Sequence, residues 1–173
     1  MYNIGVIGGG KADEKYREVS IELGRLLARR KAVVFCGGMT GVMEWVAQGV
    51  HDEKGIIVGI LPGMKMSSGN GHLTVKMPTG IGYARNFLIV RAAEALIAVD
   101  GSTGTISEAT FALSEGKSVI IIGNLDLERR KPDDGLIFRV ETAEEAVDLA
   151  FQEARKERNL LATPTPHFCS FGS

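Results

Sequence analysis

The chain of 173 residues has few cysteines, almost no net charge and no long apolar run. Its two cysteines, Cys36 and Cys169, are too few and too unpatterned for a disulfide framework or a metal site. A formal net charge of −1 gives no electrostatic reason to expect nucleic acid or an anionic membrane as a partner. No segment approaches the ~18 consecutive apolar residues of a membrane span. We therefore expect no metal, no nucleic acid and no membrane partner.

The start of the chain lacks the basic residues and the longer apolar stretch of a secretion signal, so we expect a cytoplasmic protein. The length suits one domain with a substantial core. Glycine is the residue in excess: 22 residues, against an average share of about 7%. Tight backbone turns near a ligand are one explanation for this excess.

Apolar runs alternate with amphipathic stretches along the whole chain. The apolar runs predict strands over residues 3–7, 32–36, 55–61, 73–77, 95–99, 118–123 and 136–140. The amphipathic stretches predict helices over residues 13–30, 42–50, 83–93, 105–115 and 141–158, the last opened by a capping box of Thr142 and Glu145. This alternation predicts an α/β fold: a single Rossmann-like domain over residues 1–160, with a mostly parallel sheet and helices on both faces. Residues 161–173 are expected to form a C-terminal tail.

Four glycine-bearing turns, at residues 8–10, 37–41, 80–82 and 101–104, follow predicted strands. They collect at the C-terminal edge of the sheet, where open α/β sheets bind ligands and where backbone N–H groups can approach a phosphate. The alternative is that they are only the turns that every α/β protein needs. The candidate ligand-binding residues in these turns are Gly8, Gly9, Gly37, Gly38, Thr40, Gly41, Gly101, Ser102, Thr103, Gly104 and Thr105.

None of these turns has the sequence of a known cofactor loop. Gly8-Gly-Gly10 is followed by Lys11-Ala-Asp13, so the third glycine of the dinucleotide fingerprint is absent, and no P-loop sequence is present. We therefore expect no cofactor.

Two ionisable residues, Arg85 and Glu108, are predicted at the starts of consecutive helices, near the same edge of the sheet. An arginine there can clamp an anion, and a carboxylate can act as acid, base or electrostatic stabiliser. Each has a simpler alternative. Thr105 and Glu108 have the spacing of a capping box, and Arg85 has the character of an ordinary surface residue of a helix.

The run Asp100-Gly-Ser-Thr-Gly-Thr-Ile-Ser-Glu108 resembles the signature P-G-G-x-G-T-x-x-E of the LONELY GUY-type proteins, long mislabelled lysine decarboxylases. Gly37-Gly-Met-Thr-Gly-Val-Met43 resembles the G-G-x-x-G-L-M segment of the same family. The family's Arg-Lys pair falls on Arg85-Asn86, and the spacing from Arg85 to Glu108 is the one expected of its catalytic arginine and glutamate. The resemblance covers nearly the whole chain.

The resemblance implies a nucleotide site. Active members of the family hydrolyse the N-glycosidic bond of a nucleoside 5′-monophosphate to free base and ribose 5-phosphate. Residues 101–105 would then cradle the phosphate, Arg85 would orient it, and Glu108 would assist the oxocarbenium-like transition state and the attacking water. The family's members are dimers with the site near the subunit interface, so a homo-oligomer is expected. Nothing in the sequence offers a pyridoxal-phosphate site for lysine decarboxylation.

Three departures from the family pattern weaken the case for catalysis. Asp100 replaces the signature proline, Ser102 the second glycine, and Asn86 the lysine after the arginine. These changes make the chain more similar to a sister branch that includes molybdenum-cofactor carrier proteins, which hold a phosphorylated pterin. Three functions therefore stay open: a phosphoribohydrolase, a non-catalytic binder or carrier of a nucleotide or pterin phosphate, and a scaffold with a vestigial site.

Overall fold

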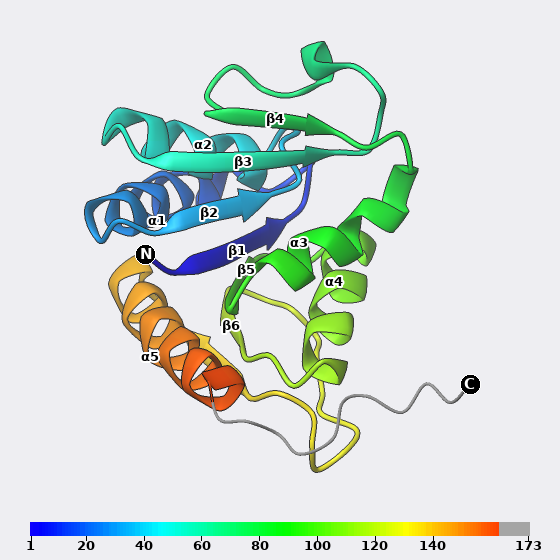
Figure 1. The fold of residues 1–173 in the computed structure, drawn as a ribbon. Coiled ribbons are helices and arrows are strands. Elements are labelled where there is room, and N and C mark those ends of the chain that lie inside the picture. Colours follow the sequence, from blue (N-terminus) through cyan, green and yellow to red (C-terminus); the bar gives the residue numbers. More distant parts are fainter. Residues whose placement is uncertain (163–173) are drawn as a thin grey trace.

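Seven parallel strands form one sheet in the computed structural model, which describes residues 1–162. In chain order they are β1 (Asn3–Gly8), β2 (Val33–Cys36), β3 (Ile56–Leu61), β4 (Val75–Pro78), β5 (Ala95–Val99), β6 (Val119–Ile122) and β7 (Ile137–Val140). Their order across the sheet is β4-β3-β2-β1-β5-β6-β7 (Figure 1). Strands β2, β3 and β4 follow one another on one side of β1, and β5, β6 and β7 follow one another on its other side. The C-terminal edge between β1 and β5 is therefore the topological switch point of the sheet.

Helices cover both faces of the sheet. One face packs against α1 (Arg17–Arg29), α2 (Val42–Asp52) and α5 (Ala143–Ala162). The other face packs against α3 (Asn86–Ala92) and α4 (Thr103–Ser114). Three single 3₁₀ turns complete the elements of the described residues: η1 (Glu14–Tyr16), η2 (Met66–Ser68) and η3 (Gly82–Arg85). The prediction of a single Rossmann-like domain with helices on both faces is confirmed.

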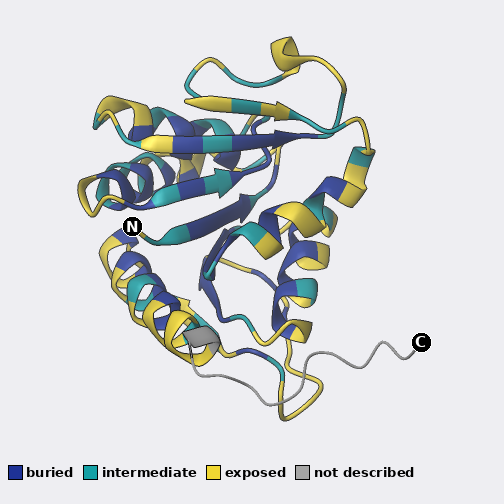
Figure 2. Ribbon diagram, in the orientation of Figure 1, coloured by how far each residue is buried: buried dark blue, intermediate teal, exposed yellow. Residues whose placement is uncertain are grey.

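The core consists of two hydrophobic clusters, one on each face of the sheet, and β5 contributes to both. Ala95, Ile97 and Val99 point into the cluster under α1, α2 and α5. Leu96 and Ala98 point into the cluster under α3 and α4. A central parallel strand is covered on both sides, so its sequence is a continuous apolar run rather than an alternating one. Burial is concentrated in the strands and on the inward sides of the helices (Figure 2).

Helices α1 and α2 approach each other closely because glycines lie at their contact. A Cβ added to Gly49 would lie 1.9 Å from the carbonyl oxygen of Ile21, and one added to Gly24 would lie 2.3 Å from that of Val46. Part of the glycine excess therefore serves helix packing and has no connection with a ligand.

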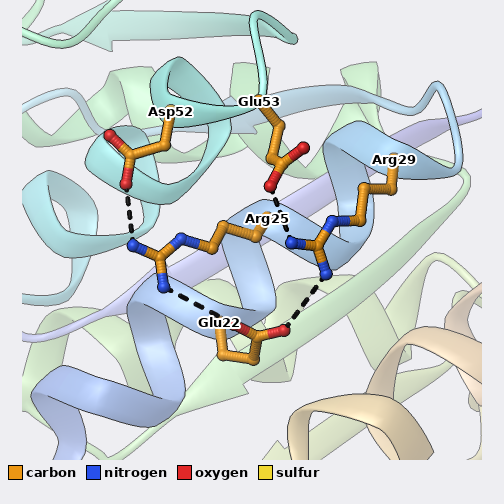
Figure 3. A network of polar contacts seen from close by, with 5 residues as sticks. All are labelled: Glu22, Arg25, Arg29, Asp52 and Glu53. Atoms are coloured by element: carbon orange, nitrogen blue, oxygen red, sulfur yellow. Dashed lines mark hydrogen bonds and ion pairs between the residues drawn. The ribbon is translucent and has the colours of Figure 1, made fainter.

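An ion-pair network links the same two helices (Figure 3). The Arg25 guanidinium lies 2.9 Å from the Asp52 carboxylate, and the Arg29 guanidinium lies 2.7 Å from that of Glu53. The Glu22 carboxylate lies between the two arginines, at 3.7 Å from Arg25 and 3.6 Å from Arg29. All five side chains are partly exposed, so the network contributes modestly to stability.

Several predicted element bounds change in the structure. The first turns of the helices predicted at 13–30 and 83–93 are the 3₁₀ turns η1 and η3, and β4 begins two residues later than predicted. The predicted capping box of α5 is present, because the Glu145 N–H donates to Thr142 Oγ1 at 3.2 Å and the Thr142 N–H donates to Glu145 Oε2 at 3.4 Å.

The end of the chain is only partly described. The predicted boundary at residue 160 falls inside α5, and residues 163–173, which include Cys169 and most of the predicted tail, lie outside the described residues. Within residues 1–162, no helix has the length and apolarity needed to cross a membrane.

Candidate functional site

A cavity of about 700 Å³, here called the edge cavity, opens at the C-terminal edge of the sheet beside the switch point. The turns after β1, β2 and β5 and the 3₁₀ turn η3 form its walls. The structure thus brings most of the predicted site residues together. Those that line the edge cavity are Gly8, Gly37, Thr40, Arg85, Ser102, Thr103, Gly104, Thr105 and Glu108.

Four of the predicted ligand-binding glycines do not line this cavity: Gly9, Gly38, Gly41 and Gly101. Three of them, Gly38, Gly41 and Gly101, lie where other parts of the protein approach closely, whereas the nearest atom to a Cβ on Gly9 would be 3.5 Å away, an ordinary contact distance. A Cβ on Gly41 would lie 2.3 Å from the Gly9 carbonyl oxygen, and a Cβ on Gly101 would lie 2.4 Å from Leu125 Cδ1. Gly38, Gly41 and Gly101 thus allow close packing behind the turns, and their neighbours in sequence form the cavity wall.

Arg85 is the last residue of η3, and its side chain extends inward toward the end of β2. It is only 8% exposed, so the alternative of an ordinary surface residue is wrong. Its guanidinium lies against Gly37, where a Cβ would come within 2.2 Å of Nη1 and 2.5 Å of Nη2. Its Nε and Nη1 are buried and have no hydrogen-bond partner among residues 1–162. Unpaired buried donors are costly and rare in folded proteins, so these two nitrogens are available for an anion that enters the cavity.

Glu108 lies in the second turn of α4 and is 7% exposed. The helix begins at Thr103 with Ser102 as its N-cap residue, two residues earlier than predicted. Thr105 is therefore inside the helix, and the capping-box explanation of Glu108 is wrong. Glu108 Oε1 lies 4.0 Å from Arg85 Nη1, so the two residues predicted at one edge of the sheet meet as a buried, loosely spaced ion pair.

Burial controls the ionisation of this pair. It raises the pKa of Glu108 to about 7, although the positive charge of Arg85 acts in the opposite direction. Burial also lowers the pKa of Arg85, opposed by the charge of Glu108. The neighbouring Cys36 thiol accepts a hydrogen bond from the Gly38 N–H at 3.3 Å, and burial raises its pKa to about 12. At neutral pH the thiol is thus uncharged, while Glu108 can gain or lose a proton.

The N-terminus of α4 faces the same cavity and lacks a capping side chain. Ser102 makes no capping hydrogen bond, because its Oγ lies 3.1 Å from Thr105 Oγ1 instead. The N–H groups of the first turn have no partner within a helix, and they lie at the positive end of the helix dipole. This end of the cavity therefore favours an anion, as does the guanidinium of Arg85.

A second cavity of about 490 Å³, here called the aromatic cavity, lies between η3, α3 and α4. Tyr83, Phe87 and Phe111 line it, and the rings of Phe87 and Phe111 meet edge to face with centroids 4.4 Å apart. Asn86 and Glu108 line both cavities. An anion-favouring space and an apolar space thus adjoin at Glu108.

Sequence reasoning missed several cavity residues. Met39, Met43 and Pro62 line the edge cavity, and Tyr83 lines both cavities. In the sequence, Asn86 stands out only as a departure from the family pattern. Its position next to Arg85 is the signal that could have identified it. Residues adjacent in sequence to a site residue lie close to that site.

Comparison with known proteins identifies the family. The sequence profile of the SLOG cluster 4 family matches residues 1–154. The chain belongs to the SLOG cluster 4 family. An uncharacterized protein of Archaeoglobus fulgidus is 42% identical to this SLOG cluster 4 protein over 119 residues, which are 69% of this chain and 78% of that protein.

Relatives of this SLOG cluster 4 protein include both kinds of protein indicated by the sequence resemblance. A protein of Oryza sativa subsp. japonica, named as a probable cytokinin riboside 5′-monophosphate phosphoribohydrolase, is 32% identical over 102 residues. The match covers 57% of this chain and 45% of the rice protein, so the chain spans less than half of that relative's length. The Moco carrier protein of Chlamydomonas reinhardtii superposes with a TM-score of 0.77 at 28% identity, covering 90% of this chain and 98% of that one. The predicted relationship to LONELY GUY-type and carrier proteins is confirmed.

Proposed function

We propose that this protein binds a nucleoside-monophosphate-like ligand at the switch point and hydrolyses its N-glycosidic bond. The observation that carries the proposal is the buried Arg85, with two unpartnered donor nitrogens, 4.0 Å from a glutamate whose pKa is about 7. The similarity to the rice phosphoribohydrolase supports the reaction type. The phosphate would meet Arg85 and the first turn of α4, and the base would lie toward the aromatic cavity.

The reaction needs a group that stabilises the positive charge that develops at the anomeric carbon. As the bond from that carbon to the base nitrogen breaks, a water oxygen bonds to the carbon and a water proton passes to the base. The Glu108 carboxylate, in the cavity wall, stabilises the oxocarbenium-like transition state, accepts the proton of the attacking water and passes that proton to the nitrogen of the departing base, which returns Glu108 to its ionised form. Since the carboxylate is the active form, kcat/KM should rise as pH increases through about 7.

The test is incubation with a panel of nucleoside 5′-monophosphates, with free base and ribose 5-phosphate as the measured products. Release from at least one nucleotide, reduced about 1,000-fold or more in Glu108→Gln, is the expected result. The exposed Glu144 provides the matched control, and Glu144→Gln should keep full activity. Absence of release from every nucleotide would refute the hydrolysis.

A carrier of a phosphorylated pterin is the second candidate function. The superposition on the Chlamydomonas carrier protein and the departures Asp100, Ser102 and Asn86 favour it. Mass spectrometry of a small molecule that co-purifies with the protein separates the two candidates. A pterin phosphate that binds without turnover, with Glu108→Gln retaining it, would support the carrier and contradict the hydrolase.

We further propose that the protein is a homo-oligomer formed through the outer side of η3, α3 and α4. Large apolar side chains are exposed there beside the aromatic cavity: Ile81, Tyr83, Phe87, Leu88 and Ile106. Tyr83 is the most exposed of these side chains, at 87%. A second copy of this chain would cover this face.

Sedimentation velocity tests the oligomer. Leu88→Glu should shift the protein to monomer, since it places a charge on the proposed contact. Met64→Glu, on the exposed loop between β3 and β4, is the control and should leave the oligomer intact. A monomeric unmutated protein would exclude this interface.

A further inference from the structure

Within the part of the chain that the structure describes, buried side-chain nitrogen and oxygen atoms without a hydrogen-bond partner occur in two consecutive residues. They are Nε and Nη1 of Arg85 and Oδ1 of Asn86. The proposed phosphate accounts for the two donors of Arg85. It does not account for Asn86 Oδ1, because a carbonyl oxygen accepts hydrogen bonds and an ionised phosphate has none to donate.

Asn86 occupies a position between the two halves of the site. It is the first residue of α3, directly after the 3₁₀ turn that carries Arg85, and it lines both the edge cavity and the aromatic cavity. On one side are the anion-favouring groups of Arg85 and the α4 N-terminus. On the other are the rings of Phe87 and Phe111, which suit a planar group.

The Asn86 oxygen requires a hydrogen-bond donor from its missing partner. A buried acceptor without a donor destabilises the protein, and a ligand that bears an N–H group at this point would remove that penalty. A carboxamide is suited to the amine-bearing edge of a heteroaromatic ring, since it accepts from the exocyclic amine and donates to a ring nitrogen. The family pattern has a lysine at this position, and a lysine can only donate hydrogen bonds, so it prefers acceptor groups on a ligand. Asn86 Oδ1 accepts instead, so it prefers donor groups on a ligand.

We propose that Asn86 is a specificity-determining residue: its Oδ1 accepts a hydrogen bond from the exocyclic amine of a planar heteroaromatic ring seated in the aromatic cavity. The inference rests on the proposed binding of a ring-bearing phosphate at this site, and it does not require hydrolysis. It predicts that the protein prefers amine-bearing rings over rings that are identical apart from the amine.

Isothermal titration calorimetry with two matched nucleotide pairs tests this inference. AMP and purine riboside 5′-monophosphate differ only in the 6-amine, and GMP and IMP differ only in the 2-amine, which pterins share with guanine. In the unmutated protein, the amine-bearing member of at least one pair should bind about tenfold more tightly. The pair that discriminates also identifies which ring edge Asn86 contacts.

Two variants of Asn86 sharpen the test. Asn86→Leu has a similar shape and no acceptor, so the ratio within the discriminating pair should fall to about one. Asn86→Asp keeps an acceptor oxygen, so the ratio should persist, although its negative charge weakens the binding of every phosphate ligand. Since the ratio compares two ligands of one variant, a general loss of stability does not change it.

Ribose 5-phosphate, which has no ring, separates the possible failures. If it binds and neither pair discriminates in the unmutated protein, or if discrimination survives in Asn86→Leu, the inference about Asn86 is overturned and the proposed phosphate site stands. If neither ribose 5-phosphate nor any of the nucleotides binds, the proposed function is overturned together with this inference.

Discussion

The guanidinium of Arg85 lies against the Cα atom of Gly37, in space that the side chain of any other residue would occupy. A Cβ at this position would lie 2.2 Å from Arg85 Nη1 and 2.6 Å from Met43 Sδ. The backbone of Gly37 does not require glycine, because its φ angle is not positive. What requires glycine here is the arginine, which makes the contact a direct test of the site.

Gly37→Ala should therefore give a folded protein with a displaced arginine. The three atoms that the methyl group meets belong to two flexible side chains, Arg85 and Met43, so they can move, at a cost of about 1–3 kcal/mol in stability. The affinity for AMP or ribose 5-phosphate should fall about tenfold or more, measured by calorimetry. Gly71→Ala is the control, since nothing lies within 4 Å of the added methyl group. Unchanged affinity in Gly37→Ala would argue against Arg85 as the phosphate ligand.

Arg85→Met should separate stability from binding. At pH 6 Glu108 is mostly protonated, so removal of the buried guanidinium leaves no uncompensated charge, and the ligand-free variant should match or exceed the unmutated protein in Tm. The increase in Tm that phosphate ligands give should disappear. Arg91→Met, at an exposed arginine paired with Glu115, is the control and should keep that increase. A severe loss of stability in ligand-free Arg85→Met would mean that the arginine is structural.

Glu108 should also make stability depend on pH. Its folded pKa of about 7 lies above the ordinary 4.5, so the folded state binds the proton more tightly. Its stabilising contribution is complete below pH 4.5 and is lost as pH rises through 7. Relative to Glu108→Gln, the unmutated protein should therefore lose on the order of 3 kcal/mol between pH 4.5 and pH 8. Urea denaturation across that range measures it, with Glu144→Gln as the exposed control, and a flat difference would contradict the raised pKa.

Gly49→Ala should destabilise the fold without touching the site. The added methyl group would lie 1.9 Å from the Ile21 carbonyl oxygen, which is backbone and cannot rotate away. We expect a loss of about 3 kcal/mol or more, visible as a decrease in Tm of roughly 10 °C. Asp52→Asn, which removes the charge that pairs with Arg25 across the same two helices, should cost less than about 1 kcal/mol, because the pair is partly exposed. Comparable losses in the two variants would mean that charge, and not close packing, holds α1 against α2.

The sheet could be predicted from sequence because its strands are continuous apolar runs separated by amphipathic stretches. The edge that carries the site followed from the same pattern, since turns after parallel strands must meet at one edge. The start of α4 was misplaced because both Ser102 and Thr105 are plausible N-cap residues, and only the backbone distinguishes them. That error produced the capping-box explanation of Glu108.

Burial of single side chains could not be predicted in the same way. Arg85 and Asn86 follow an exposed tyrosine on a short 3₁₀ turn, and local sequence gives no reason for one of them to turn inward. The space for Arg85 comes from Gly37, far away in the chain, and the roles of Gly24 and Gly49 depend on a contact between two helices. Such features arise from tertiary packing, which a single sequence does not display.

The glycine contact between α1 and α2 has a further consequence for the energetics of the site. These helices follow the turns after β1 and β2, so their fixed spacing also fixes the two turns that form one wall of the edge cavity. That wall is preorganised, and a ligand loses little conformational entropy against it. The opposite wall is formed by η3 and the start of the seven-residue helix α3. The outer side chains of these two elements are exposed. The entropic cost of binding should therefore fall on the segment that carries Arg85 and Asn86.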